Sequence, residues 1–173
     1  MGYFCSLESR RHFMHMTLTT EPTPRTAQKL QKIWPRVFVV EPDYDTALTI
    51  KTAIENGGKT WEQYDVMITN GDWQSLADTQ NIRNQIVHWQ ADIVIIEYLD
   101  VPGADWLIEQ LKKLPEPPIV IVTSHHSNSI KTDEFKASLQ REFDIEDYVR
   151  KPFNPHIIME VVNQHWLPKT ILA

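Results

Sequence analysis

Five polar residues follow apolar runs of the sequence closely, and their side chains have the chemistry of a small charged site. Glu41 and Asp43 follow the run VFVV, Glu97 follows IVII, and Thr123 follows IVIV; Lys151 comes shortly after the weaker run DYV. Carboxylates bind divalent cations or pair with a lysine, and hydroxyl and ammonium groups donate hydrogen bonds to charged oxygens. These residues form one site if the fold brings them together.

The apolar runs themselves predict the strands of a sheet that is covered on both faces. Three runs are short, continuous and β-branched, at residues 37–40, 93–96 and 119–122, and weaker strand patterns lie at 65–68 and 147–149. A strand buried on both faces has this composition, because helices cover each side of a parallel sheet.

Helical patterns lie between the strands, and the fifth begins with Asn154 as N-cap and Pro155 at the first helical position. Strand and helix alternate five times. Right-handed crossovers then predict an α/β fold, a (βα)5 doubly wound parallel five-stranded sheet. The predicted buried faces are Ala47, Ile50 and Ile54; Thr79, Ile82, Ile86 and Trp89; Leu107, Ile108, Leu111 and Leu114; Phe135, Leu139 and Phe143; and Ile157, Ile158, Val161 and Val162.

In such sheets, ligands bind beyond the carboxyl ends of the strands. The five polar residues all stand at those ends. We therefore expect two or three carboxylates, a hydroxyl and a lysine to converge on one edge of the sheet.

The charge of the chain is unevenly distributed. The 173 residues carry a formal charge of −6. Residues 1–35 contain five basic and two acidic groups, a net +3, and residues 36–173 contain twelve basic and twenty-one acidic groups, a net −9. We interpret residues 1–35 as an N-terminal extension, a tail or a docking segment with a short helix over 26–34, and residues 36–173 as the folded domain.

The composition excludes several classes of protein. Hydrophobic residues at 42% and charged residues at 23% are ordinary for a globular protein and exclude collagen-like and disulfide-scaffold chains. The single Cys5 forms no internal disulfide, which favours a reducing, cytoplasmic location. No apolar run approaches the roughly 18 residues of a membrane span, and the acidic balance argues against direct nucleic-acid binding.

Four segments resemble the receiver domains of response regulators, the phosphoacceptor modules of two-component signalling. They are RVFVVEPD, ADIVIIEYLDVPG, PPIVIVTS and DYVRKPF, in the family's order and spacing. The resemblance covers about residues 36–165. It implies a flavodoxin-like, CheY-like fold with strand order 2-1-3-4-5.

The resemblance also implies a role for each polar residue. Glu41 and Asp43 match the acidic cluster that holds Mg²⁺, Thr123 the switch hydroxyl, Tyr148 the switch aromatic and Lys151 the lysine that contacts the phosphoryl group. In the family an aspartate attacks the phosphoryl group while Mg²⁺ offsets its charge.

The chain departs from the family at the phosphoacceptor position, which holds Glu97. One additional methylene moves the carboxylate about 1.5 Å outward, and in-line transfer depends on positioning on that scale. The glutamate also reaches toward the volume of a phospho-aspartate. We therefore expect Glu97 to pair with Lys151 without any phosphate.

Two further departures lie beside it. Pro42 stands in the acidic pair, so that only Asp43, one step later, can add a second carboxylate to Glu41. The loop from Glu97 to Pro102 is one residue longer than usual and contains Asp100, interpreted as a solvated loop acid or a displaced ligand. Because Mg²⁺ requires near-octahedral oxygen geometry, we expect at most weak binding through Glu41, Asp43 and Glu97.

Together these departures predict an atypical response regulator, a pseudo-receiver that signals by phosphorylation-independent protein–protein interaction. It is then not an enzyme, and we expect no catalytic residue and no cofactor. The alternative is a receiver that is still phosphorylated in a phosphorelay, with a rearranged Mg²⁺ site. A flavin binder on the same topology is less favoured, because Pro42 stands where a phosphate-binding loop would begin.

The resemblance implies a second signalling protein as partner: a histidine kinase, a regulator or an output protein. Acidic residues between 133 and 147 flank the fourth helix and fifth strand. The family uses this surface for partners and dimers, so a homodimer through the fourth helix, fifth strand and fifth helix is the second expectation.

The segment 70–90 is longer than a compact receiver needs, and we expect an extended second helix after a loop at 71–73. Trp73 is interpreted either as an exposed contact beside the site or as a side chain packed under that helix.

Overall fold

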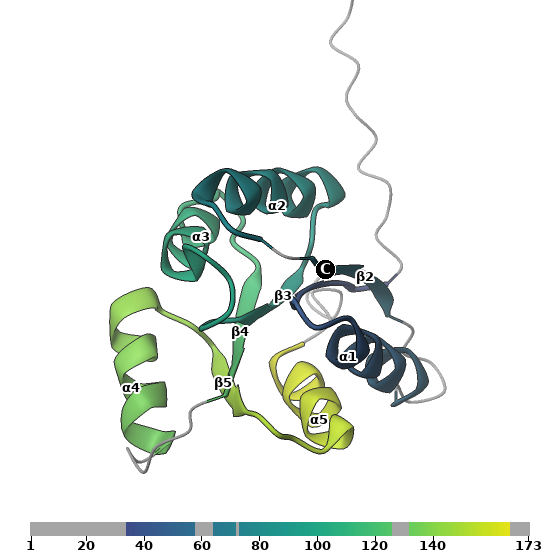
Figure 1. Ribbon diagram of the computed structural model, residues 1–173. Helices are drawn as coiled ribbons and strands as arrows, with labels where there is room; N and C mark the ends of the chain where they lie inside the picture. The colour runs from purple at the N-terminus through teal and green to yellow at the C-terminus, as the bar shows by residue number, and fades with distance from the viewer. Residues whose placement is uncertain (1–33, 58–63, 72, 126–131, 167–173) are drawn as a thin grey trace, which may run out of the picture. The chain divides into compact units, whose positions relative to one another are not determined.

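The structure is a computed structural model that describes residues 34–57, 64–71, 73–125 and 132–166. All five predicted strands are confirmed, each longer than predicted by one or two residues. Strands and helices alternate along the chain (Figure 1): β1 (Arg36–Val40), α1 (Tyr44–Gly57), β2 (Asp65–Thr69), α2 (Leu76–Trp89), β3 (Ile93–Glu97), α3 (Ala104–Lys112), β4 (Ile119–Ser124), α4 (Thr132–Phe143), β5 (Asp147–Arg150) and α5 (Pro155–His165).

The N-terminal extension stays a prediction. Residues 1–33, with nearly all of the helix predicted over 26–34, lie outside the described residues.

The sheet is parallel throughout and has the order β2-β1-β3-β4-β5, as predicted. In its register Val40 lies beside Ile96, and Glu97 lies beside Thr123. The carboxyl ends of β1, β3 and β4 are therefore aligned, and the residues that end or follow these strands meet at one edge.

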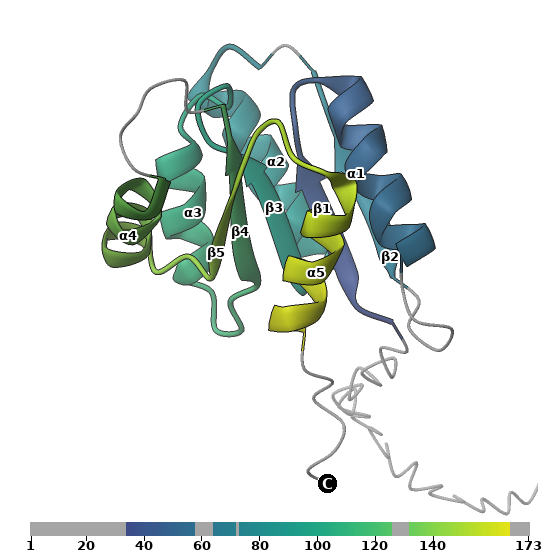
Figure 2. The ribbon, with the colours of Figure 1, turned by 90° about the horizontal axis from the view of Figure 1, so that it is seen from below.

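Helices cover both faces of the sheet and enclose two hydrophobic cores. Figure 1 and Figure 2 show α1 and α5 on one face and α2, α3 and α4 on the other. Alternate residues of one strand enter different cores: in β4, Val120 and Val122 face the side of α2, α3 and α4, while Ile121 faces α1 and α5. This two-sided burial explains the continuous apolar runs of β1, β3 and β4.

The predicted start of α5 is confirmed, but its buried face is partly wrong. Asn154 is the N-cap, with its side chain accepting a hydrogen bond from the His156 backbone N–H at 3.0 Å. Ile157, predicted to be buried, is 43% exposed, and Met159 is buried in its place. The helix therefore turns a somewhat different stripe toward the sheet than the spacing of its β-branched residues suggested.

The segment 70–90 does not form an extended helix. α2 has 14 residues, the same length as α1, and the additional chain lies in the loop before it. A capping box between Ser75 and Asp78 starts α2 at Leu76. Trp73 is half-buried and packs against the core, which favours the second of its two interpretations.

The helices are all short. Among the described residues, none combines the length and the apolar character that crossing a bilayer requires.

Candidate functional site

Four of the predicted site residues meet in a buried cluster at the carboxyl edge of the sheet. Glu41 follows β1 directly, Glu97 ends β3, Thr123 lies in β4 and Lys151 follows β5. Their exposed fractions are 2%, 0%, 0% and 5%. Charged side chains are almost never buried this deeply unless they are paired, so each charge requires a partner within the cluster.

Lys151 is that partner for both glutamates. Its Nζ lies 2.5 Å from Oε2 of Glu41 and 2.5 Å from Oε2 of Glu97. The cluster contains two carboxylates and one ammonium group. The expected pairing of Glu97 with Lys151 is present in the structure, and Glu41 takes part in it as well.

Burial and the ion pairs shift the pKa values of the cluster in opposite directions. Burial raises the pKa of Glu41, more than hydrogen bonding to Lys151 lowers it. Burial also acts to lower the pKa of Lys151, but the hydrogen bonds and charges of the two glutamates outweigh it, so the lysine pKa is raised. The ammonium group is thus the firmly charged member of the cluster.

Each glutamate also folds back onto its own chain. Oε1 of Glu41 accepts a hydrogen bond from the backbone N–H of Asp43 at 3.2 Å, and Oε1 of Glu97 accepts one from Leu99 at 3.3 Å. In both cases the donor is two residues further on. Since Pro42 has no N–H, Asp43 supplies the first backbone donor after Glu41. The remaining Oε2 atoms are left to face Lys151.

Asp43 does not join the cluster with its side chain. Its carboxylate is exposed, and Oδ1 accepts a hydrogen bond from the backbone N–H of Thr46 at 2.8 Å, as an N-cap of α1 does. The bonds to Thr46 lower the pKa of Asp43.

This arrangement does not fit a magnesium site made of Glu41, Asp43 and Glu97. Lys151 stands between the two glutamates, and Asp43 caps α1. Within the described ranges, no three His, Cys, Asp or Glu side chains are grouped to hold a metal ion. The weak magnesium site stays a prediction that requires Asp43 to leave its capping position.

Thr123 and Tyr148 lie on opposite faces of the sheet beside the cluster. The Thr123 hydroxyl donates a hydrogen bond to Oε2 of Glu97 at 3.4 Å. Tyr148 is 7% exposed, packs edge-on against Phe135 of α4 with ring centroids 5.3 Å apart, and donates its hydroxyl to the Ser124 carbonyl at 3.4 Å. Burial raises the pKa of Tyr148 above 10.0. The tyrosine ring therefore lies inside the protein and not at its edge.

The long loop between β3 and α3 is fastened to α2. Val101 is buried, and the buried Thr79 donates its hydroxyl to the Pro102 carbonyl. Gly103 has φ = 72°, and an added Cβ would lie 2.9 Å from Leu76. Asp100 is exposed, as expected for a solvated loop acid. Sequence reasoning placed Thr79 on the buried face of its helix but missed this bond, because nothing local marks a carbonyl 23 residues away as its acceptor.

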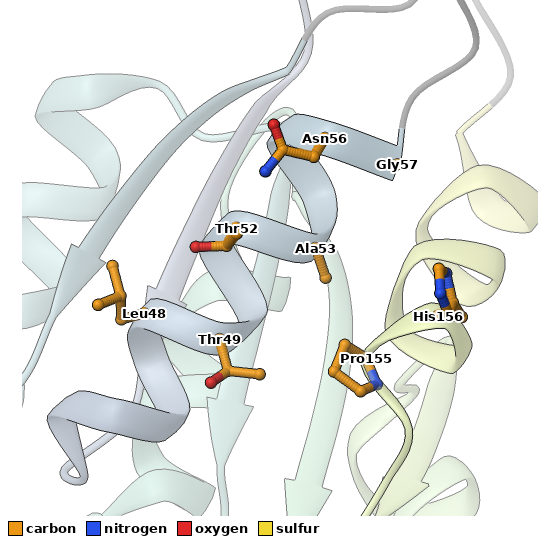
Figure 3. A pocket seen from close by; sticks show the side chains of 8 residues that line it. All are labelled: Leu48, Thr49, Thr52, Ala53, Asn56, Gly57, Pro155 and His156. Carbon is orange, nitrogen blue, oxygen red and sulfur yellow. The ribbon is translucent and has the colours of Figure 1, made fainter.

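Two surface hollows border α1. One, of about 240 Å³, borders Lys151 and is lined also by Asp45, Thr46, Thr49, His125, Pro152 and Phe153. The other, of about 460 Å³, lies between α1 and the start of α5 (Figure 3). Figure 3 shows uncharged side chains of α1 along it, with Pro155 and His156 opposite. The residues that line the second hollow include no Asp, Glu, Lys or Arg, whereas those of the first include Asp45 and Lys151.

Comparison with solved structures identifies this architecture. No protein-family model and no curated protein matches the chain. The receiver domain of RstA from Klebsiella pneumoniae, in a BeF3-activated form, aligns over 75% of this chain and 97% of its own, with 16% identity and a TM-score of 0.56. The isolated receiver domain of RcsB from Salmonella enterica aligns over 75% and 86%, with 19% identity and a TM-score of 0.55.

A pilus assembly protein, CpaE from Caulobacter crescentus, aligns over 76% of this chain and 98% of its own, with 16% identity and a TM-score of 0.52. These identities are too low to transfer a function. With five parallel strands in the order 2-1-3-4-5 and five helices, the chain has the flavodoxin-like fold of response-regulator receiver domains.

Proposed function

We propose that this chain is a pseudo-receiver, a receiver-fold signalling module that acts by protein–protein interaction without phosphorylation of its strand-end carboxylate. The observation that carries this proposal is the state of Glu97. Its two carboxylate oxygens already accept hydrogen bonds or an ion pair from Lys151, Thr123 and the Leu99 backbone.

The physical reason is that a nucleophile needs a free, aligned oxygen. Attack on a phosphoryl group by Glu97 would require withdrawal of the carboxylate from Lys151, which would leave buried charge uncompensated. The additional methylene displaces the oxygen by about 1.5 Å as well. Both effects oppose in-line transfer, so the module has no enzymatic role in this proposal.

In this proposal the contacts of Glu97 with Lys151 and Thr123 hold the module in one conformation. In the receiver resemblance the lysine and the hydroxyl contact the phosphoryl group. Here Lys151 and Thr123 contact Glu97 instead, and Tyr148 is buried against α4. In this proposal the Glu97 carboxylate takes the place of the phosphoryl group that the lysine and the hydroxyl of a receiver would contact.

The partner in this proposal is another protein of a cytoplasmic signalling pathway: a histidine kinase, a regulator or an output protein. The face of α4, β5 and α5 is a second contact surface, through which two copies of the chain would form a homodimer. It carries exposed charges of both signs, including Arg141, Arg150 and Glu142, and such mixed charge is compatible with a self-complementary contact.

The alternative function is a receiver that is still phosphorylated, with a rearranged magnesium site. The observation that favours it is that Asp43 and Asp100 are both exposed acids on loops at the carboxyl edge of the sheet. Quenching of tryptophan fluorescence by Mg²⁺, abolished in Asp43→Asn, would support this alternative.

The deciding experiment measures the intact mass of the protein after incubation with acetyl phosphate and Mg²⁺. A receiver domain with an aspartate at the phosphoacceptor position is treated in parallel as the positive control. We expect the control, and not this chain, to gain a hydroxylamine-sensitive phosphoryl group. A phosphoryl adduct on Glu97 or Asp100 would overturn the proposal in favour of the alternative.

A second experiment connects the cluster to output. Tagged wild type, Glu97→Ala and Glu109→Ala are compared in a pull-down read by mass spectrometry. Glu109 is an exposed acid of α3 and serves as the matched control. A partner that is retained by wild type and Glu109→Ala but lost with Glu97→Ala ties the cluster to binding. Equal retention by all three variants contradicts that link.

A further inference from the structure

A second buried charge cluster lies away from the strand-end site, around Asp147 at the start of β5. This strand is at the edge of the sheet, and Asp147 is 7% exposed. Its Oδ1 atom lies 2.5 Å from Nζ of Lys136 and accepts the backbone N–H of Tyr148 at 2.8 Å. Its Oδ2 atom lies 3.1 Å from Nε2 of His165.

The two side chains that contact Asp147 come from different helices. Lys136 lies in the second turn of α4, and His165 is the last residue of α5. Figure 2 shows these helices on either side of β5. One carboxylate on the edge strand is therefore in contact with both helices.

Burial distinguishes this cluster from the ordinary surface ion pairs of the chain. The side chains of Asp147, His165 and Lys136 are 10%, 22% and 36% exposed, whereas those of Lys113 and Glu109 are 65% and 52% exposed. Exposed pairs within one helix contribute little to stability, while buried carboxylates depend on their partners. Although burial opposes it, hydrogen bonding to Lys136, His165 and Tyr148 lowers the pKa of Asp147, so the carboxylate is ionised.

α4 contacts the rest of the protein through apolar side chains and through Lys136. Leu139 and Phe143 are the apolar side chains of α4 that are buried, and Phe135 is half-buried. Phe135 packs on Tyr148, and the next residue of α4, Lys136, pairs with the preceding residue of β5, Asp147. The same turn of α4 therefore contacts two consecutive residues of β5. It packs on Tyr148 and forms an ion pair with Asp147.

We propose that Asp147 is a shared latch, a positioning residue that holds α4 and the end of α5 to β5, so that loss of its charge releases both helices together. This goes beyond the proposed function, because it concerns a cluster that shares no residue with the Glu41–Lys151–Glu97 site. In this proposal the Asp147 carboxylate, and not the hydrophobic core beneath the helices, makes α4 and the end of α5 loosen together.

Hydrogen–deuterium exchange of the full chain, resolved by peptide, tests the latch. In Asp147→Asn we expect amide exchange to accelerate roughly tenfold in both α4 and the last turn of α5, the factor that corresponds to losing a hydrogen bond to a charged group. In Lys136→Gln the acceleration is confined to α4, and in His165→Gln to the end of α5. The exposed variant Glu109→Gln leaves both segments at the wild-type rate.

Rescue separates a charge contact from general packing. Lys136→Arg retains the positive charge and keeps the exchange of α4 within about twofold of wild type. The latch is overturned if Asp147→Asn loosens only one helix, or neither, or if Lys136→Arg loosens α4 as much as Lys136→Gln does. If Asp147→Asn does not fold, the single variants decide: each must loosen its own helix, and failure of either contradicts the proposal.

Discussion

Lys151 and Glu97 form a buried ion pair across the carboxyl edge of the sheet, with 2.5 Å between Nζ and Oε2. Glu41 shares the same ammonium group from the other side. The ion pair compensates the buried carboxylates that follow β1 and end β3, since both engage the single ammonium group of the cluster.

Replacing Lys151 by Met should destabilise the protein by about 3–5 kcal/mol, because two buried carboxylates lose their counter-charge. Urea unfolding, monitored by tryptophan fluorescence, measures this loss. Lys113→Met is the matched control, since its exposed pair with Glu109 predicts a change of less than about 0.5 kcal/mol. Similar losses in the two variants would contradict the assignment of Lys151 as the central charge.

The Lys151→Met substitution should be less damaging in a Glu97→Gln background. With Glu97 neutral, only Glu41 remains as an uncompensated carboxylate when the lysine is removed. A double-mutant cycle of the two substitutions, measured by urea unfolding, should give a coupling free energy of about 1–3 kcal/mol. Additive effects would show that the two side chains do not interact in solution.

Thr79→Val should loosen the loop between β3 and α3. The substitution preserves the shape of the side chain but leaves the Pro102 carbonyl without its donor, at a cost of about 1–3 kcal/mol for a buried unsatisfied group. Thermal unfolding and amide exchange of residues 98–103 measure the effect. Thr52→Val, on the exposed side of α1, is the control; unchanged exchange of the loop in Thr79→Val would refute the bond.

The charge of Asp147 predicts an acid-dependent loss of stability. Its pKa is lowered in the folded state from 3.8, so the unfolded chain takes up a proton more readily, and the contribution of Asp147 is complete above that value. Stability should then fall as the pH decreases from 3.8 through the lower folded-state pKa.

Thermal unfolding between about pH 2.5 and pH 5, a window that brackets the ordinary pKa of Asp, measures this loss. Asp147→Asn should show a flatter profile than wild type, whereas Asp133→Asn, on the exposed first turn of α4, should retain the wild-type slope. Equal slopes in all three proteins would exclude Asp147 as the source.

The strands and the members of the cluster could be predicted because their signals are local. Continuous β-branched runs mark strands buried on both faces, and parallel pairing then places Glu41, Glu97, Thr123 and Lys151 at the same edge. The ion pair of Glu97 with Lys151 was predicted from the receiver resemblance together with the length of a glutamate side chain at the phosphoacceptor position.

The remaining features depend on contacts between distant segments, which a single sequence does not show. Asp43 was predicted as a member of the acidic cluster, yet its side chain caps α1, because a carboxylate just before a helix is also the ideal acceptor for unpaired backbone N–H groups. The buried face of α5 also differs from the prediction because of a contact with a distant segment. Ile157 and Met159 are both apolar, and only the packing against α1 decides that the second is buried, where the methionine lies directly against Gly57.

The order of the strands gives the central lysine a further consequence for how the chain folds. Glu41 and Lys151 are separated by 110 residues, and the lysine directly follows β5, the last of the described strands. Until β5 docks at the edge of the sheet, the carboxylates at the ends of β1 and β3 have no cation and resist desolvation. Long-range contacts of this kind slow folding. We therefore expect Glu41, at the end of β1, to become buried only when β5 has docked. A fragment that ends before Lys151 should remain open at the edge where the cluster would form.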